Sequence, residues 1–177
     1  MAKLRKACAY RRLERPYTRR SKYRNQNYIK GNPRSKVVRY DHGNPRKEYP
    51  YKVVLVANDN VQVRHNAIES SRLAANRRLE KNLGKGNFHF RIRMFPHHIL
   101  RENPLASGAG ADRMSTGMKK SFGKAIGVAA QVTYGKELLE VNVEKNQINQ
   151  ARKALKAAAH KLPCACSVAV KQKPVTI

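Results

Sequence analysis

The sequence has few acidic residues. Asp and Glu number 11 against 38 Lys and Arg, which gives a formal net charge of +27 over 177 residues. A compact chain with this excess repels itself, and a polyanionic partner that neutralises it is the economical explanation. Nucleic acid is the commonest such partner, and an anionic membrane surface is the second. The acids that are present include no close pair in an apolar setting, which argues against carboxylate acid–base catalysis.

Cysteines and long hydrophobic runs are also scarce. The three cysteines make no even disulfide framework, which predicts a reduced, cytoplasmic compartment. No stretch approaches the roughly eighteen apolar residues of a spanning helix. Residues 1–17 lack the apolar run of a secretory signal, and their tyrosines and prolines fit a transit helix badly. We therefore expect no membrane association.

No metal or cofactor site is predicted. Cys164 and Cys166 are two residues apart with no second pair, whereas zinc sites need four ligands. Within a strand over 163–170 both cysteines share one face with Val168 and Val170, which predicts that they face the core. His97 and His98 are adjacent, so on an extended segment they point to opposite sides and share a metal with difficulty.

Residues 103–124 raise three alternatives: a nucleotide-phosphate loop, a disordered linker, or a finger that lies against a larger nucleic acid. The segment holds four glycines and four basic residues. Gly117 and Gly123 have five residues between them where a Walker loop has four, and Arg113 replaces the third glycine of a dinucleotide fingerprint. Small residues permit close backbone approach and the basic ones suit phosphates, which favours the finger.

The N-terminal part is the most basic. Residues 1–50 hold 16 basic and 3 acidic residues, and seven of the eight tyrosines lie within residues 1–51. Basic side chains interleaved with aromatic rings suit an RNA surface, although a disordered basic tail is the alternative. We therefore expect an irregular RNA-binding extension, with contacts from Arg11, Arg12, Arg15, Tyr17, Arg19, Arg20 and Lys30.

From residue 51 onward the pattern becomes that of a folded core. Strands are expected over 51–57, 88–94 and 163–170, and over 127–135 and 136–143 as a hairpin that turns at Gly135. Helices are expected over 61–84, capped by residues 58–60, and over 145–161. This order predicts an α+β fold, a sandwich with a mostly antiparallel sheet and two main helices. The domain boundaries would be 1–50 for the extension, 51–172 for the core with an internal loop at 101–124, and 173–177 for a short tail.

Basic residues on the core elements are further RNA candidates. Arg64 and Arg72 lie on the outer face of the first expected helix, together with Arg77, Arg78 and Lys81, and a solvated charged face is an equal alternative there. Arg91 and Arg93 share the outer face of a strand about 7 Å apart, which roughly matches successive phosphates.

A second class of function remains open, an RNA-modifying or RNA-cleaving enzyme that uses a histidine. His65, His97 or His98 could act as a general base. Nothing in the sequence distinguishes one of them, and no paired catalytic group accompanies any.

Three segments together resemble one protein family. They are "RPYTRRSKY…YIKGNPRSKVVRYDHGN", "VQVRHNAIESSRLAANRRLEKNLGKGNFHFRIRMFPHHILREN" and "ASGAGADRMSTGMKKSFGKAIGVAAQV". The chain resembles the large-ribosomal-subunit family called "ten-e" in archaea and eukaryotes, universal family sixteen, the counterpart of bacterial large-subunit protein sixteen. The resemblance runs from about Tyr10 to Val170 and is nearer to the archaeal form.

This resemblance implies a hammerhead-type α+β domain and a non-enzymatic structural role in the large subunit. The implied partners are the rRNA near the central protuberance and the peptidyl-transferase region, the A-site tRNA and neighbouring large-subunit proteins, with no homo-oligomer. The internal loop would reach toward the tRNA. In this sequence its residues are Arg101, Ser107, Gly108, Gly110, Arg113, Lys119, Lys120 and Lys124.

Overall fold

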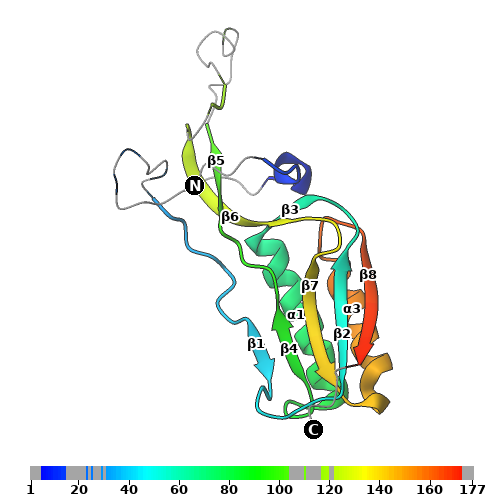
Figure 1. Cartoon of the computed structure of the whole chain (residues 1–177). Coiled ribbons are helices and arrows are strands. Elements are labelled where there is room, and N and C mark those ends of the chain that lie inside the picture. The colour runs from blue at the N-terminus through cyan, green and yellow to red at the C-terminus, as the bar shows by residue number, and fades with distance from the viewer. Residues whose placement is uncertain are drawn as a thin grey trace.

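The main part of the molecule is a five-stranded antiparallel sheet in the order β1–β4–β7–β2–β8, with two helices along one face (Figure 1). The computed structural model describes residues 5–14, 23, 25, 29, 31–103, 110, 117–119 and 122–172. The strands are β1 (Asp41–Gly43), β4 (His89–Ile92), β7 (Glu137–Val143), β2 (Tyr51–Ala57) and β8 (Cys166–Gln172), and the helices are α1 (His65–Leu83) and α3 (Ile148–Ala159).

A second sheet has three antiparallel strands in the order β3–β6–β5. These strands are β3 (Val61–Arg64), β6 (Lys124–Val132) and β5 (His98–Glu102). Figure 1 shows β5 and β6 extending beyond the end of the larger sheet as a two-stranded arm. Short 3-10 turns occur at Ala7–Tyr10 and Lys145–Gln147. An α+β fold with a mostly antiparallel sheet and two main helices was predicted from the sequence. The structure confirms this fold class and divides the strands between two antiparallel sheets.

The core lies between the large sheet and the helices. The predicted helical stripe is buried, with Ile68, Ala75 and Leu79 at most 1% exposed. The alternation over residues 88–94 is also confirmed, because the apolar side chains of this segment are buried and the arginines are exposed. Helix α1 ends at Gly84, whose N–H donates to Glu80 O at a φ of 77°, a left-handed conformation that favours glycine.

The start of the first helix was predicted wrongly. Residues 61–64 form β3, which pairs with β6 from Val61↔Val132 to Arg64↔Ala129, and α1 begins only at His65. Val61 and Val63 are buried because they belong to this strand, and not because they lie on the apolar side of a helix. Two β-branched residues at alternate positions favour a strand, and their pairing partner lies almost 70 residues away in the sequence.

The predicted hairpin at Gly135 was also wrong. Strand β6 belongs to the three-stranded sheet and β7 to the five-stranded sheet, so the two consecutive strands do not pair with each other. The turn at Gly135, with a φ of 79°, carries the chain from one sheet to the other. Its N–H donates to Ala57 O at 2.9 Å, which fixes the turn to the end of β2.

Several contacts join the described part of residues 1–50 to the core. Strand β1 pairs with β4 from Asp41↔Arg91 to Gly43↔His89. Nearer the N-terminus, Gln62 N donates to Arg11 O at 2.8 Å, and the Gln62 side chain donates to Tyr10 O at 3.1 Å. Among the described residues, none of the helices has both the length and the apolar character needed to cross a membrane.

Candidate nucleic-acid interface

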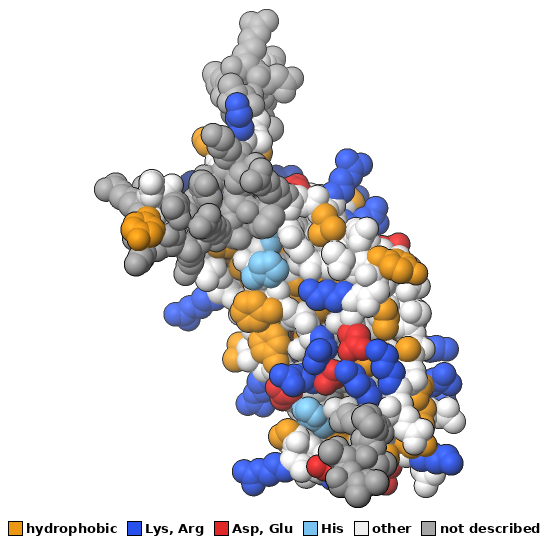
Figure 2. All heavy atoms as spheres, viewed as in Figure 1, with side chains coloured by type: hydrophobic (Ala, Val, Ile, Leu, Met, Phe, Trp, Pro, Cys, Tyr) orange, Lys and Arg blue, Asp and Glu red, His pale blue; other side chains and the backbone are white. Residues whose placement is uncertain are grey.

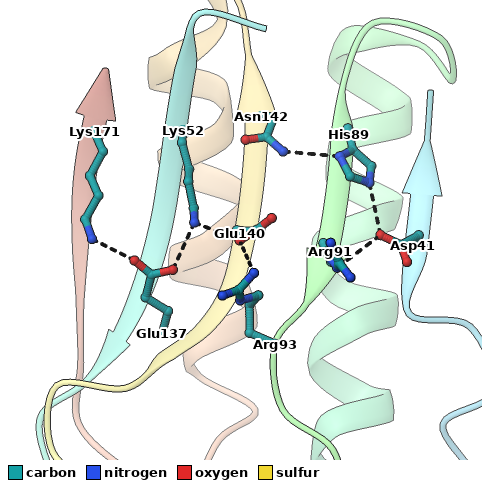
Figure 3. Close-up of polar contacts among 9 residues, drawn as sticks. All are labelled: Asp41, Lys52, His89, Arg91, Arg93, Glu137, Glu140, Asn142 and Lys171. Atoms are coloured by element: carbon teal, nitrogen blue, oxygen red, sulfur yellow. Dashed lines mark hydrogen bonds and ion pairs between the residues drawn. The ribbon is translucent and has the colours of Figure 1, made fainter. Parts of the chain in front are cut away.

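The outer face of the five-stranded sheet, opposite the helices, carries a network of ion pairs (Figure 3). Lys52 Nζ lies 3.0 Å from Glu137 Oε2 and 2.9 Å from Glu140 Oε2. Lys171 Nζ lies 2.7 Å from Glu137 Oε1, and Arg93 Nη1 lies 3.5 Å from Glu140 Oε2. Hydrogen bonds from Lys171 and Lys52 hold the pKa of Glu137 below its usual value. The cations at the centre of this face are therefore balanced by carboxylates.

A β-bulge explains how two glutamates three residues apart reach the same lysine. The β2–β7 register shifts between Leu55 and Val56, so that Leu55 faces Leu139 and Val56 faces Glu137. The extra residue in β7 restores Glu137 to the side of the sheet that Glu140 occupies. Lys52 then bridges both carboxylates. Figure 2 shows acidic side chains set among basic ones on this face.

A second cluster on the same face joins β1, β4 and β7. Asp41 Oδ1 lies 3.0 Å from His89 Nε2 and 3.5 Å from Arg91 Nε, and Asn142 Nδ2 lies 3.2 Å from His89 Nδ1. Sequence reasoning missed this role of Asp41 and His89, because their contact depends on the pairing of strands 48 residues apart. Arg91 and Arg93 do share one face as predicted, with side chains 50% and 44% exposed.

The two helix candidates, Arg64 and Arg72, differ from the sequence-based prediction. Arg64 lies at the end of β3 and precedes α1; its Nη2 donates to Arg5 O at 2.8 Å and its guanidinium lies 5.8 Å from the Tyr10 ring. Arg72 Nε donates to Glu69 at 2.9 Å, and only 14% of its side chain is exposed. The placement of Arg64 on the helix was wrong, and contacts within the protein engage both guanidinium groups.

The N-terminal candidates are described only in part. The side chains of Arg11 and Arg12 are exposed, next to the 3-10 turn that β3 anchors. Arg15, Tyr17, Arg19, Arg20 and Lys30 lie outside the described residues.

The root of the internal loop is well defined. Arg101, in β5, donates from Nη1 to Phe122 O at 2.7 Å. Gly123 has a φ of 104°, which favours glycine, and a Cβ there would lie 3.1 Å from Glu102 O, a tight approach. The loop proper therefore spans residues 103–123, between β5 and Lys124 at the start of β6.

The loop candidates are likewise described in part. Lys119 and Lys124 are exposed, as are the apolar side chains of Met118 and Phe122. Gly110 has a φ of 98° and open space around it. Ser107, Gly108, Arg113 and Lys120 lie outside the described residues.

The three histidines considered for catalysis have structural environments. His65 Nδ1 accepts a hydrogen bond from Lys36 N at 3.2 Å, and burial together with Lys36 and Arg64 lowers its pKa. His98 is 3% exposed, and burial lowers its pKa to about 4. His97 is exposed and contacts Phe95 O through Nδ1 at 3.2 Å. Over the described ranges, none of the three forms an ion pair with a carboxylate, which a general base of the usual kind would use for orientation.

The cysteines pack as the alternation predicted. Cys164 and Cys166 are half-buried against the main core, with Val168 and Val170 beside them. Their Sγ atoms are 3.5 Å apart. In the part of the chain that the structure describes, no group of three or more His, Cys, Asp or Glu side chains could hold a metal ion.

Comparison with known proteins identifies the family of this chain. A family model described as ribosomal protein L16p/L10e matches residues 14–169. The large ribosomal subunit protein uL16 of Methanococcus maripaludis is 45% identical over 168 residues, which cover 94% of each chain. Its namesake in Methanoculleus marisnigri is 42% identical, over 93% of this chain and 94% of the relative. That in Methanocella arvoryzae is 43% identical over 92% of each. With this coverage and identity, the chain belongs to the ribosomal protein L16p/L10e family.

Proposed function

We propose that this chain is a structural constituent of the large ribosomal subunit, that it binds rRNA near the central protuberance and the peptidyl-transferase region, and that its arm helps to position A-site tRNA. The observation that carries the proposal is the charge excess. Eleven acids cannot balance 38 basic residues, and several of those acids are already engaged on the sheet face. A permanent polyanion would neutralise the rest. The curated relatives are named as large-subunit proteins.

The test is co-sedimentation of a tagged copy through a sucrose gradient at moderate and then high salt. Migration with the large subunit at both salt concentrations is the expected result. Free migration, or release at modest salt, would indicate a loosely bound factor and would contradict the proposal.

Replacement of Arg91 and Arg93 by glutamine is expected to weaken rRNA binding. Both side chains are about half exposed and their carboxylate partners are 3.5 Å away, a pairing worth at most about 1 kcal/mol, so phosphates can compete for them. The slope of log affinity against log salt should become shallower by roughly 0.7–0.9 for each phosphate that the variant no longer binds. A filter-binding titration over several KCl concentrations measures it.

The matched control for that pair is Lys47→Gln with Lys85→Gln. Both lysines are exposed and neither belongs to the ion-pair network on the sheet face, so the control removes the same charge from outside that network. Equal slopes in the two double variants would exclude Arg91 and Arg93 as specific rRNA ligands.

The proposed tRNA role is tested by deleting Ser107–Gly117. The arm of β5 and β6 is held at its root by the Arg101–Phe122 hydrogen bond, which the deletion leaves in place. The variant is therefore expected to fold and to enter large subunits, but to bind aminoacyl-tRNA poorly at the A site. Thermal unfolding and an A-site binding assay with purified ribosomes measure the two effects. Loss of folding would make the segment structural, and normal tRNA binding would refute the tRNA role.

A further inference from the structure

A basic groove of about 520 Å³ lies between the two helices. None of the residues that line it belongs to the ion-pair network on the outer face of the sheet. Five of the residues that line it are lysine or arginine and one is histidine, and no acidic side chain contributes. Its lining residues are Ala74, Arg77 and Arg78 from α1 and Lys153, Lys156, Ala157, His160 and Lys161 from α3 and the turn after it.

The spacing of these residues builds the groove. Arg77 and Arg78 follow Ala74 by three and four positions, and on α3 the positions 153, 156, 157, 160 and 161 recur at the same intervals. Residues three and four apart share one side of a helix. Ala74 and Ala157 are half-buried with short side chains, so they leave the space between the helices unfilled, while the long basic side chains are exposed along its walls.

The cations of the groove lack internal counter-ions. Over the described ranges, none of its lysines and arginines lies within ion-pair distance of a carboxylate, whereas Lys52, Arg91 and Arg93 on the sheet face all do. The negative end of the α3 dipole favours His160 and Lys161 at its C-terminus. It also favours Lys156 in the last turn of α3, but it does not account for Arg77, Arg78 or Lys153. Five like charges around one groove repel one another and create a positive potential that an external anion would relieve.

We propose that this groove binds the phosphodiester backbone of rRNA, an inference that rests on the proposed function. An acidic protein segment is the competing occupant. Protein interfaces usually have aromatic or large aliphatic anchors at their centre, but the only apolar residues here are two alanines. Backbone contacts to phosphate need only basic side chains in reach. The helices lie along one face of the large sheet, and the arm projects beyond its end (Figure 1). We therefore assign rRNA to the groove, and not the tRNA that is proposed for the arm.

The experiment compares two triple variants of the full chain. The groove variant is Arg78→Gln, Lys153→Gln and Lys156→Gln. The control is Arg46→Gln, Lys85→Gln and Lys145→Gln, which removes the same charge from exposed positions outside the groove. All six side chains are exposed, so both variants should keep the wild-type melting temperature. The probe is deproteinised large-subunit rRNA, titrated at several KCl concentrations, with hydroxyl-radical footprinting at saturation.

The groove variant is expected to shallow the salt slope by roughly 2–3 units, to bind at least about tenfold more weakly at 0.1 M salt, and to lose a discrete set of backbone protections. The control should keep those protections. The inference is overturned if both variants behave alike, if tRNA binding falls while rRNA binding does not, or if only incorporation beside neighbouring proteins falls. Failure of the wild-type protein to bind the rRNA would instead refute the proposed function itself.

Discussion

Replacement of Gly43 by alanine is expected to lower the free energy of unfolding by about 2–3 kcal/mol. Gly43 ends β1 at a φ of 82°, where an L side chain costs about 1–2 kcal/mol. A Cβ there would overlap the Phe88 carbonyl oxygen and lie 2.9 Å from the Phe88 carbonyl carbon. Both atoms belong to backbone and cannot rotate away. Relief of the overlap must separate β1 from β4 and break the 2.9 Å bond from Asn44 N to Phe88 O, a further loss of about 1 kcal/mol.

Thermal unfolding and urea titration measure this loss. For a chain of this size 1 kcal/mol corresponds to roughly 2–4 °C, so the melting temperature should fall by roughly 4–12 °C. The matched control is Gly135→Ala. Its φ is 79°, but no atom lies within 4 Å of the added Cβ, so only the backbone strain applies. Equal losses in the two variants would mean that β1 can move away from β4 at little cost.

The sequence predicted those elements whose signal is local. The alternation around Phe90 and the helical spacing around Leu79 and Leu155 each recur within one segment, and all three residues are buried as expected. Strands β3 and β5 were missed because they are four and five residues long and owe their conformation to pairing with β6. A short segment without sustained alternation carries too little periodicity to distinguish a strand from a loop or a helix start.

The sequence predicted which kinds of residue form the candidate site, but not which of their side chains pair with one another. Charge counting predicted a nucleic-acid partner, and the family resemblance predicted a ribosomal protein, which membership of the L16p/L10e family confirms. Counting could not tell that Arg91 faces Asp41 across strands that are distant in the sequence. Two features of the sequence could nevertheless have predicted contacts or surfaces that the structure shows. The Glu69–Arg72 spacing of three predicts a helical ion pair, and the spacing of Lys153, Lys156 and His160 marks a basic side of α3.

His98 should make the fold sensitive to mild acid. It lies in β5 at the root of the arm, 3% exposed, and its Nδ1 has no hydrogen-bond partner among the described residues. Burial, with smaller contributions from His97 and Arg101, lowers its pKa to about 4 from 6.5. Between these two values the unfolded chain binds a proton that the native state does not. Stability attributable to His98 is therefore complete above pH 6.5 and falls by about 1.4 kcal/mol per unit as the pH decreases toward 4.

Urea unfolding of the wild type and of His98→Leu between pH 7.5 and 4.5 tests this. The wild type is expected to lose about 2–3 kcal/mol more than the variant over that range. This pH interval separates the effect of His98 from the effects of Glu137 and Glu69. The pKa values of both glutamates are lowered in the fold, so the stability that they contribute is lost mainly below about pH 4.5. His97→Gln, a change at the exposed neighbour, should keep most of the wild-type pH dependence, because burial contributes more than His97 to the lowered pKa of His98. If His98→Leu also kept the wild-type pH dependence, another group would be responsible for the acid sensitivity. Protonation of His98 in the folded protein would then cost little free energy.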